Sequence, residues 1–444
     1  SERLAELARI TQLPARPRVQ NSTGVVSSQP SAEVKTPAKQ PRIEFLEIRD
    51  NSGLAEKAVR ARLQVALGEA LDRKSLAQRI SELYGSGLYQ SIDYELVEKN
   101  GKTGLRINAK AKSWGPDYLQ FGMQLEENFS ADTSFNFGLA YIRTAINGLG
   151  GQWRTQLDLG DRQGVYTELY QPWSYDGRLF SRFRLGYERN ILRVYNDNSD
   201  AIADIGIREL GSSISLGRQF GKTAELELAW RSLYGEVSNL VGIVDTETDT
   251  FDISEVSLTY RYDTLNRTNR PSSGSLLRLS VLSSPQSWRA TSEYEQAYGL
   301  AMKAMHIPGG QASVSAILGS TVDSGSPLQS QFVLGGTGRL SGHAVNRFFG
   351  QHIAHMVANA SWDITRLALP AYVGLSAEIG NTWDNSFGNG PDEWINAGSV
   401  YVGLNTVVGA VYVGAGFAED GTRSFYLSLG NPYTAKPIRP FDEN

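Results

Sequence analysis

From Trp114 to the end of the 444-residue chain, the sequence shows no helical periodicity and repeats one short pattern instead. Apolar and polar residues alternate in segments of about ten residues, separated by clusters of Gly, Asn, Asp and Ser. In one such segment, Trp153, Thr155, Leu157 and Leu159 alternate with Gln152, Arg154, Gln156 and Asp158. Because side chains on a β-strand point alternately to its two faces, each segment predicts a strand with one apolar and one polar face. The pattern therefore indicates a large all-β fold.

Two all-β architectures produce this alternation, and the length of the run favours one of them. We expect sixteen strands, an even number that allows an antiparallel barrel to close, starting near residues 116, 131, 149, 163, 177, 200, 222, 251, 275, 289, 310, 351, 369, 398, 408 and 423. A soluble sandwich rarely needs so long an unbroken run, whereas a membrane barrel turns its apolar face to lipid and its polar face to the lumen. Aromatic residues near strand ends are typical of interfacial girdles: Trp153, Trp173, Trp230, Trp362, Trp383, Tyr187, Tyr234, Tyr260 and Tyr262. We predict a 16-stranded antiparallel transmembrane β-barrel over residues 114–444, with a soluble β-sandwich as the alternative.

Composition narrows the function. The chain has 43 Lys plus Arg against 47 Asp plus Glu, a balance that argues against a nucleic-acid binder. It has no Cys, and therefore no disulfide, thiol nucleophile or thiolate metal site. No apolar run approaches the roughly 18 residues of a membrane-spanning helix, and the mean hydropathy is −0.31, which a barrel of alternating strands also gives.

A small domain precedes the barrel, over residues 42–113. A strand is expected over 42–49, then a helix that carries Leu54, Ala58 and Leu63 and ends at Gly68, and a second helix with Asp72 as N-cap that carries Leu76, Ile80, Leu83 and Tyr84. Two further strands are joined at Asn100-Gly101, the strongest short signal for a hairpin. The expected order is β-α-α-β-β.

The first 41 residues are not expected to form a hydrophobic core of their own. Residues 1–13 predict a short helix, which is either the end of an upstream domain or a frayed terminus. Residues 14–41 are rich in Pro, Ser, Gln, Val and Lys and predict a linker.

The sequence gives little support for a catalytic or a metal site. His352 and His355 lie three residues apart on a predicted strand and therefore on opposite faces, which argues against a metal site; the other histidines are His306 and His343. No G-x-S-x-G nucleophile motif occurs, and no Ser partner for His355 suggests itself, so we expect neither a catalytic site nor a cofactor. The charged residues of the polar strand faces predict either a salt-bridged lumen wall or the lining of a polypeptide path: Arg154, Asp158, Arg182, Arg184, Glu188, Glu225, Glu227 and Arg231.

Three motifs resemble one family. The pattern Leu83-Tyr84-x-x-Gly87-x-Tyr89-x-x-Ile92 resembles the helix-to-strand signature of a POTRA domain. The long connection between the eleventh and twelfth strands, residues 323–351, contains Phe332-Val-Leu-Gly335-Gly336-Thr-Gly-Arg339-Leu340-Ser341-Gly342-His343, which resembles the sixth-loop motif of the Omp85 superfamily. Residues 409–416 and 424–433 are similar to the closing hairpin of those barrels. The order and spacing of the three motifs are more specific than any one of them.

The loop motif departs from the family pattern at one informative position. The family core, Val-Arg-Gly-Phe or Tyr, is here Leu340-Ser341-Gly342-His343, so the arginine that normally pairs with an acid of the barrel wall is missing. The resemblance places that acid at Glu378, beside Gly380. We hypothesise that Arg339 or His343 takes the place of the missing arginine, and that replacing Glu378 by Ala loosens the loop.

With its single POTRA domain, the chain looks most like the translocator of a patatin-like type Vd autotransporter. This resemblance implies a protein of the bacterial outer membrane, with the POTRA domain in the periplasm, that exports and displays its own N-terminal passenger. The passenger, a patatin-like phospholipase, would lie upstream, and this chain itself would not be an enzyme. Implied partners are the passenger, outer-membrane lipids, periplasmic chaperones and the barrel assembly machinery; homo-oligomerisation is left open. The alternatives are a two-partner secretion pore or an insertase acting on a separate polypeptide, and a barrel enzyme that hydrolyses lipid esters.

Overall fold

A computed structural model describes residues 41–85, 87–113, 115, 117–127, 133–196, 201–242, 249–267, 269–322, 325–364, 370–406 and 409–430. The predicted helix over 1–13, almost all of the predicted linker over 14–41, and residues 431–433 of the closing motif lie outside the described residues. None of the described helices is long and apolar enough to cross a membrane.

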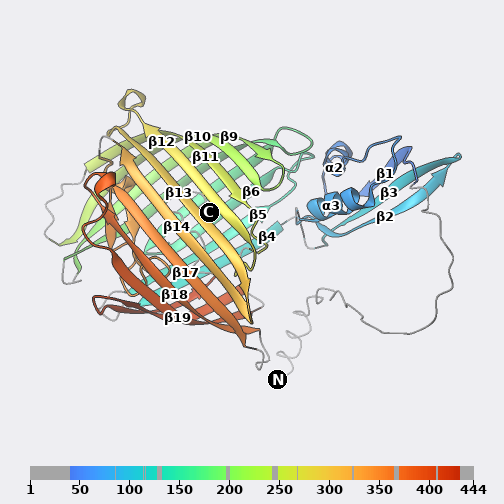
Figure 1. The fold of residues 1–444 in the computed structure, drawn as a ribbon. Helices are drawn as coiled ribbons and strands as arrows, with labels where there is room; N and C mark the ends of the chain where they lie inside the picture. Colours follow the sequence, from blue (N-terminus) through green and yellow to red (C-terminus); the bar gives the residue numbers. More distant parts are fainter. Residues whose placement is uncertain are drawn as a thin grey trace, which may run out of the picture. The chain divides into compact units, whose positions relative to one another are not determined.

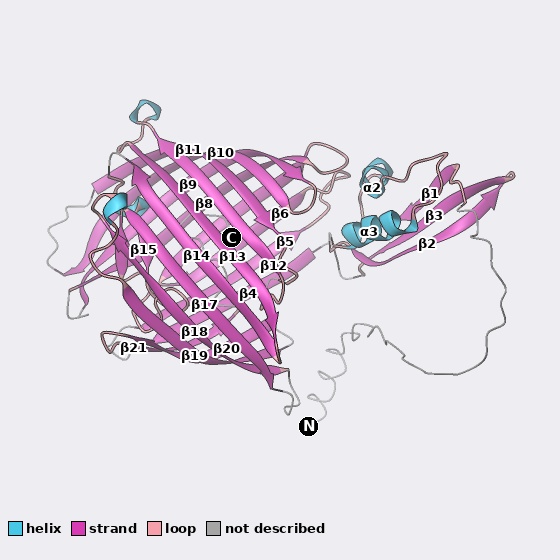
Figure 2. Ribbon diagram, in the orientation of Figure 1, coloured by secondary structure: helices cyan, strands magenta, loops and turns pink. Residues whose placement is uncertain are grey.

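The small N-terminal unit is an α+β sheet with two helices on one face (Figures 1 and 2). Its elements are β1 (Phe45–Asp50), α2 (Glu56–Leu63), α3 (Arg73–Tyr84), β2 (Tyr89–Lys99) and β3 (Lys102–Ala111). The sheet order is β1-β3-β2; β1 is parallel to β3 and β2 is antiparallel to it, so β1 and β2 are its edges. Val59 and Leu63 of α2 and Leu76 and Leu83 of α3 pack on Leu46, Leu105 and Ile107 of the sheet.

Local signals mark two of these boundaries as predicted. The Asp72 carboxylate accepts hydrogen bonds from the N–H groups of Lys74 (3.0 Å) and Ser75 (3.2 Å), which caps α3. Asn100 and Gly101 join β2 to β3 with φ of 53° and 73°, the left-handed pair of a type I′ hairpin turn.

The first helix ends earlier than predicted. The helix stops at Leu63, not at Gly68, because Gln64 adopts the left-handed conformation with φ 49°. The following residues bond to the segment before β1 instead: Gly68 N–H donates to the Ile43 carbonyl (2.7 Å) and Ile43 N–H to the Glu69 carbonyl (3.0 Å). A tertiary pairing therefore ends this helix.

The predicted fold class is confirmed: among the described residues, sixteen antiparallel strands form one closed barrel. The strands are β4 (Asp117–Glu127), β5 (Thr133–Arg143), β6 (Gln152–Gly160), β7 (Arg162–Pro172), β8 (Leu179–Tyr195), β9 (Ala201–Phe220), β10 (Ala224–Gly242), β11 (Asp249–Asp263), β12 (Gly274–Ser284), β13 (Tyr294–Ile307), β14 (Gly310–Val322), β17 (His352–Ile364), β18 (Ala371–Trp383), β19 (Ile395–Thr406), β20 (Gly409–Ala418) and β21 (Arg423–Leu429). Each pairs with its sequence neighbour, and β21 pairs with β4. The largest error in a predicted start is at β13, which begins at Tyr294 rather than near 289.

Strand length was less predictable. The strands β8 to β11 have 17, 20, 19 and 15 residues rather than about ten, and they run diagonally across the wall (Figure 2). The apolar face points out: Leu226, Leu228 and Trp230 of β10 are exposed, whereas Glu227 is buried. Trp383 is an error of the girdle prediction, since it is buried and stacks on Phe387 with ring centroids 5.8 Å apart.

The barrel closes at its shortest pairing, which we call the seam. Five residue pairs join β21 to β4, from Phe425–Glu127 to Leu429–Met123. The next shortest pairings of described wall strands, β20 with β21 and β6 with β7, have seven.

Candidate functional site: the lumenal loop and its contacts with the wall

The connection between β14 and β17, described over 325–351, folds into the barrel. It carries a short hairpin of β15 (Phe332–Leu334) and β16 (Phe348–Gly350). Phe332, Leu334 and Leu340 are fully buried against Tyr298, Ile317 and Ile353 of the wall. We call this segment the lumenal loop.

Glu378 of β18 holds the tip of the lumenal loop. Its carboxylate accepts hydrogen bonds from Leu340 N–H (2.7 Å), Ser341 N–H (2.8 Å) and the Ser341 hydroxyl (2.7 Å). Ser376, two residues earlier on the same face of β18, adds a fourth donor at 2.6 Å. Glu378 is 4% exposed, so its charge is compensated by these donors rather than by water.

The donors that meet Glu378 are not the side chains that we hypothesised. Arg339 donates to the Val333 carbonyl within its own loop, and burial lowers its pKa to about 10. His343 lies 3.2 Å from both the Arg347 guanidinium and the Thr422 hydroxyl through Nδ1, and burial lowers its pKa to about 4. Two main-chain N–H groups and a hydroxyl therefore meet the acid where the family motif has a guanidinium.

The loop backbone approaches the wall closely at Gly342. A Cβ there would lie 2.8 Å from Ala418 N and Phe417 C, and φ is +102°, so only glycine fits without strain. On the opposite side of this contact, a Cβ on Gly416 would lie 2.5 Å from Gly342 N. The neighbouring Leu340 has φ 75° although it is not glycine, and its side chain is fully buried.

Two further contacts, which the sequence reasoning missed, join the loop to the seam strands. Thr337 N–H donates to the Glu126 carboxylate of β4 (3.2 Å), and Gly342 N–H donates to the Ser424 hydroxyl of β21 (3.2 Å). Glu126 and Ser424 are both buried, and nothing in the sequence marked them as partners of a segment more than 80 residues away.

The remaining predicted loop and wall residues are glycines at close approaches. Gly335 and Gly336 have φ of 123° and 94°, and a Cβ on Gly335 would lie 2.4 Å from the Ala344 carbonyl oxygen. A Cβ on Gly380 would lie 2.7 Å from the Ala354 carbonyl oxygen and 3.0 Å from His355 Cδ2.

The POTRA-like signature residues are only partly brought together. Leu83, Tyr89 and Ile92 meet in the core of the small unit, where burial raises the pKa of Tyr89 to about 12. Gly87 has φ 78° before β2. Tyr84 is 50% exposed and takes no part in the core.

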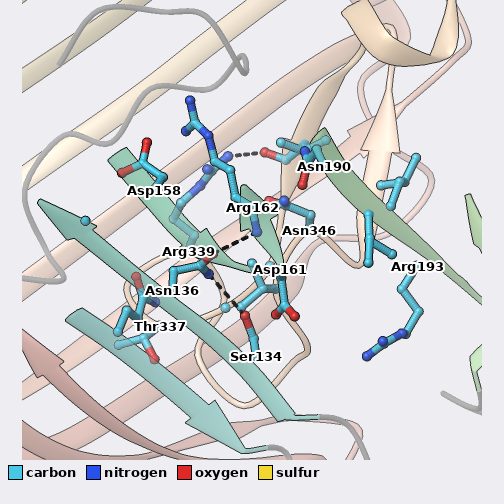
Figure 3. Close-up of a pocket in the computed structure, with 18 of the residues that line it drawn as sticks. Ser134, Asn136, Asp158, Asp161, Arg162, Asn190, Arg193, Thr337, Arg339 and Asn346 are labelled. Carbon is cyan, nitrogen blue, oxygen red and sulfur yellow. Dashed lines mark hydrogen bonds between the residues drawn. The ribbon is translucent and has the colours of Figure 1, made fainter. Parts of the chain in front are cut away.

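Beside the lumenal loop lies a cavity of about 600 Å³ (Figure 3). Thr337, Arg339 and Asn346 of the loop face Asn136, Asp158 and Arg162 of the wall across it, and Gln124 and Ser428 of the seam strands also line it. Many wall charges pair with one another: Arg182 with Glu225 and Glu227, Arg184 with Glu168, and Arg231 with Glu255.

Comparison with known proteins identifies the family. Residues 145–401 match the Omp85 superfamily domain. BamA from Haemophilus ducreyi lacking POTRA domains 1–3 superposes with a TM-score of 0.64 at 14% identity, covering 88% of this chain and 84% of that one. CdiB from Acinetobacter baumannii and CdiB from Escherichia coli each give 0.58 at 11% identity, covering 88% of this chain and 74% and 77% of theirs. No curated protein sequence matches significantly.

The family model covers more than half of the chain, and the sixteen-stranded closed barrel agrees with it. This chain belongs to the Omp85 superfamily and is a β-barrel protein of the bacterial outer membrane.

Proposed function

We propose that this chain is the translocator of a type Vd autotransporter, which carries its own upstream passenger, a patatin-like phospholipase, to the cell surface. The observation that carries the proposal is the seam: the barrel closes with five residue pairs, and the lumenal loop bonds to both strands that form it. A wall that opens for a polypeptide is best opened where the fewest backbone hydrogen bonds are lost.

The small unit at residues 42–113 supports the same proposal as a single periplasmic POTRA domain. Its strand β2 is an edge, so its outer N–H and C=O groups are available to an unfolded chain by β-augmentation. Tyr94 and Leu96 on β2 are about 40% exposed and offer apolar contacts to such a chain.

The remaining partners follow from this assignment. Outer-membrane lipids contact the exposed apolar face, and periplasmic chaperones with the barrel assembly machinery deliver the barrel to the membrane. The alternative, a secretion pore or insertase for a separate polypeptide, would use the same seam and the same edge strand.

A disulfide across the seam tests the role of the seam in export. Leu125 and Leu427 are directly paired across it, within reach of a disulfide, and the chain has no natural Cys that could compete. In the natural full-length protein we expect the L125C/L427C variant to export its passenger only after reduction. The matched control is L139C/L157C, a directly paired position between β5 and β6, which should export under both conditions. Equal export by the oxidised seam variant would contradict the proposal.

A further inference from the structure

The turn between β11 and β12 reaches along the mouth of the barrel to the ends of β14, β17 and β18. Its base, residues 264–267, is fixed to its end, since the Asn266 side-chain oxygen accepts from Ser272 N–H (3.0 Å) and Ser273 N–H (3.3 Å). The described residues 269–273 complete the turn, and within them Arg270 contacts β17 and β18. The strands β13 and β14 separate β12 from β17, so the turn passes the ends of both. We call residues 264–267 and 269–273 the strap.

Arg270 latches the strap through several contacts. Its Nε donates to the Ser361 hydroxyl (2.9 Å), its Nη1 to the Asp363 carboxylate (2.5 Å) and its Nη2 to the Ser361 carbonyl (3.4 Å). The guanidinium lies over the Tyr372 ring, 4.1 Å from its centroid. From β14, the Gln311 amide donates to the Arg270 carbonyl at 2.7 Å.

The backbone at the latch is strained. Arg270 has φ 54°, a left-handed conformation that costs free energy for a residue other than glycine. Its side chain is nevertheless only 16% exposed. A conformation of this kind persists where the surrounding contacts hold it, which indicates that the latch shapes the turn.

The latch rests on a layer of buried tyrosines. Tyr372, Tyr401, Tyr412 and Tyr426 form one cluster across β18 to β21. Their rings occupy space that glycines of neighbouring strands leave open: a Cβ on Gly403 would lie 2.0 Å from the Tyr372 ring, and one on Gly374 2.2 Å from the Tyr401 ring. The strap therefore meets the tyrosine layer at Tyr372, and the layer continues from there across β19 and β20 to the seam strand β21.

The strap lies at the barrel end opposite the one from which the lumenal loop enters. Because the strands alternate in direction, the β11–β12 turn shares its end with Asp117, where the chain enters β4, while the lumenal loop leaves β14 at the other end. Asn269 of the strap and Leu328 and Thr337 of the lumenal loop line the same cavity. The two segments thus enter the lumen from opposite ends.

We propose that the strap is a gate at the chain-entry mouth of the barrel, latched by Arg270 to Ser361, Asp363 and Tyr372, and that a polypeptide entering the lumen must release it. The contacts of Arg270 place the strap at this mouth. The narrowing of the mouth is the part of the proposal that needs no passenger, and the release by a polypeptide rests on the proposed function.

Conductance tests the narrowing without any passenger. In planar bilayers, the full chain carrying Arg270→Ala should show a single-channel conductance at least about two-fold above that of the unchanged chain, because pore radius limits ion flow. The matched control is Arg289→Ala: Arg289 also has a left-handed φ, 68°, but lies exposed in the β12–β13 turn at the other end. An Arg270→Ala barrel that folds and conducts like the control would overturn the gate.

Two further variants keep the test decisive if Arg270→Ala does not fold or if no channel conducts. Asp363→Ala and Gln311→Ala each remove one hydrogen-bond partner of Arg270 and leave Arg270 in place. In each we expect a cysteine placed at lumenal Asn359, the only thiol of the chain, to react with a bulky maleimide at least about ten-fold faster than in the unchanged background. Equal labelling rates in both would overturn the gate.

Export separates the gate from the proposed function. Cysteines at positions 270 and 361, joined by a bismaleimide, should block passenger export while the unlinked double variant exports. If conductance rises in Arg270→Ala but the linked strap still exports, the mouth is narrowed and the release step is wrong. If neither form exports and the unchanged protein does not either, the proposed function is wrong and the conductance result stands.

Discussion

At the scale of single residues, the lumenal loop depends on one buried carboxylate. Glu378 collects four hydrogen-bond donors from Leu340, Ser341 and Ser376, and removing it takes this acceptor from the two buried main-chain N–H groups of Leu340 and Ser341. The sequence located this acid because the family motif marks it, but it could not identify the donors. Main-chain N–H groups carry no signature in the sequence, and the left-handed φ of Leu340 that aims one of them depends on tertiary packing.

The first prediction concerns Glu378→Ala. Each unsatisfied buried donor costs about 1–3 kcal/mol, so the loop should lose several kcal/mol of local stability. Hydrogen exchange over residues 335–345 should accelerate by at least about a hundred-fold, with a fall in export. Glu393→Ala, at an exposed turn position, is the control. Unchanged protection of the loop in Glu378→Ala would contradict the assignment of Glu378 as its anchor.

The second prediction is a pH dependence of the same loop. Burial lowers the pKa of His343 from 6.5 to about 4, because its ring packs against Phe348 and Arg347, with Asp420 partly opposing the shift. The folded loop therefore binds this proton less readily than an unfolded one, and its stability should fall by up to about 3 kcal/mol as the pH drops from 6.5 to 4. Loop exchange rates, corrected for intrinsic pH effects, should show this slope in the natural chain and lose it in His343→Asn. The same slope in both proteins would exclude His343 as its source.

At the scale of elements, the sequence predicted the strand starts, turns and caps that depend on neighbouring residues. Alternation placed the starts of the barrel strands within five residues, and the Asn100-Gly101 turn and the Asp72 cap were visible directly. The lengths of β8 to β11 were missed because strand residues continue past the apolar band without a turn signal. The end of α2 was missed because a backbone pairing with the segment before β1 ends it, not Gly68.

The third prediction follows from that helix end. Gln64 is exposed and has a left-handed φ of 49°, so Gln64→Gly should stabilise the small unit by about 0.5–1 kcal/mol. The control is Gln78→Gly, at an exposed position inside α3, which should destabilise it by about 1 kcal/mol. Hydrogen-exchange protection of α2 and α3 measures both. A loss of protection in Gln64→Gly would contradict the role of residue 64 as a strained helix end.

At the scale of the whole molecule, the barrel combines a short seam with a lumen occupied from both ends. The lumenal loop bonds to both seam strands, and the strap lies on the tyrosine layer that includes Tyr426 of β21. The family resemblance implied a loop that folds back into the lumen and a weak seam between the first and last strands. The bonds of the loop to the seam strands and the position of the strap were not predictable, because they join residues far apart along the chain through the closure of the barrel. What the sequence did predict was the architecture that makes them possible, an even number of alternating strands after one small α+β unit.

The most direct test of the proposed function is the location of the passenger domain that we propose upstream of this chain. The natural full-length protein is produced in a bacterial outer membrane, and protease is added to intact cells. The account predicts that the upstream domain is digested while the barrel survives, because the domain has crossed the membrane. Protection of that domain in intact cells, with digestion only after the outer membrane is opened, would contradict the claim that this barrel exports its own passenger.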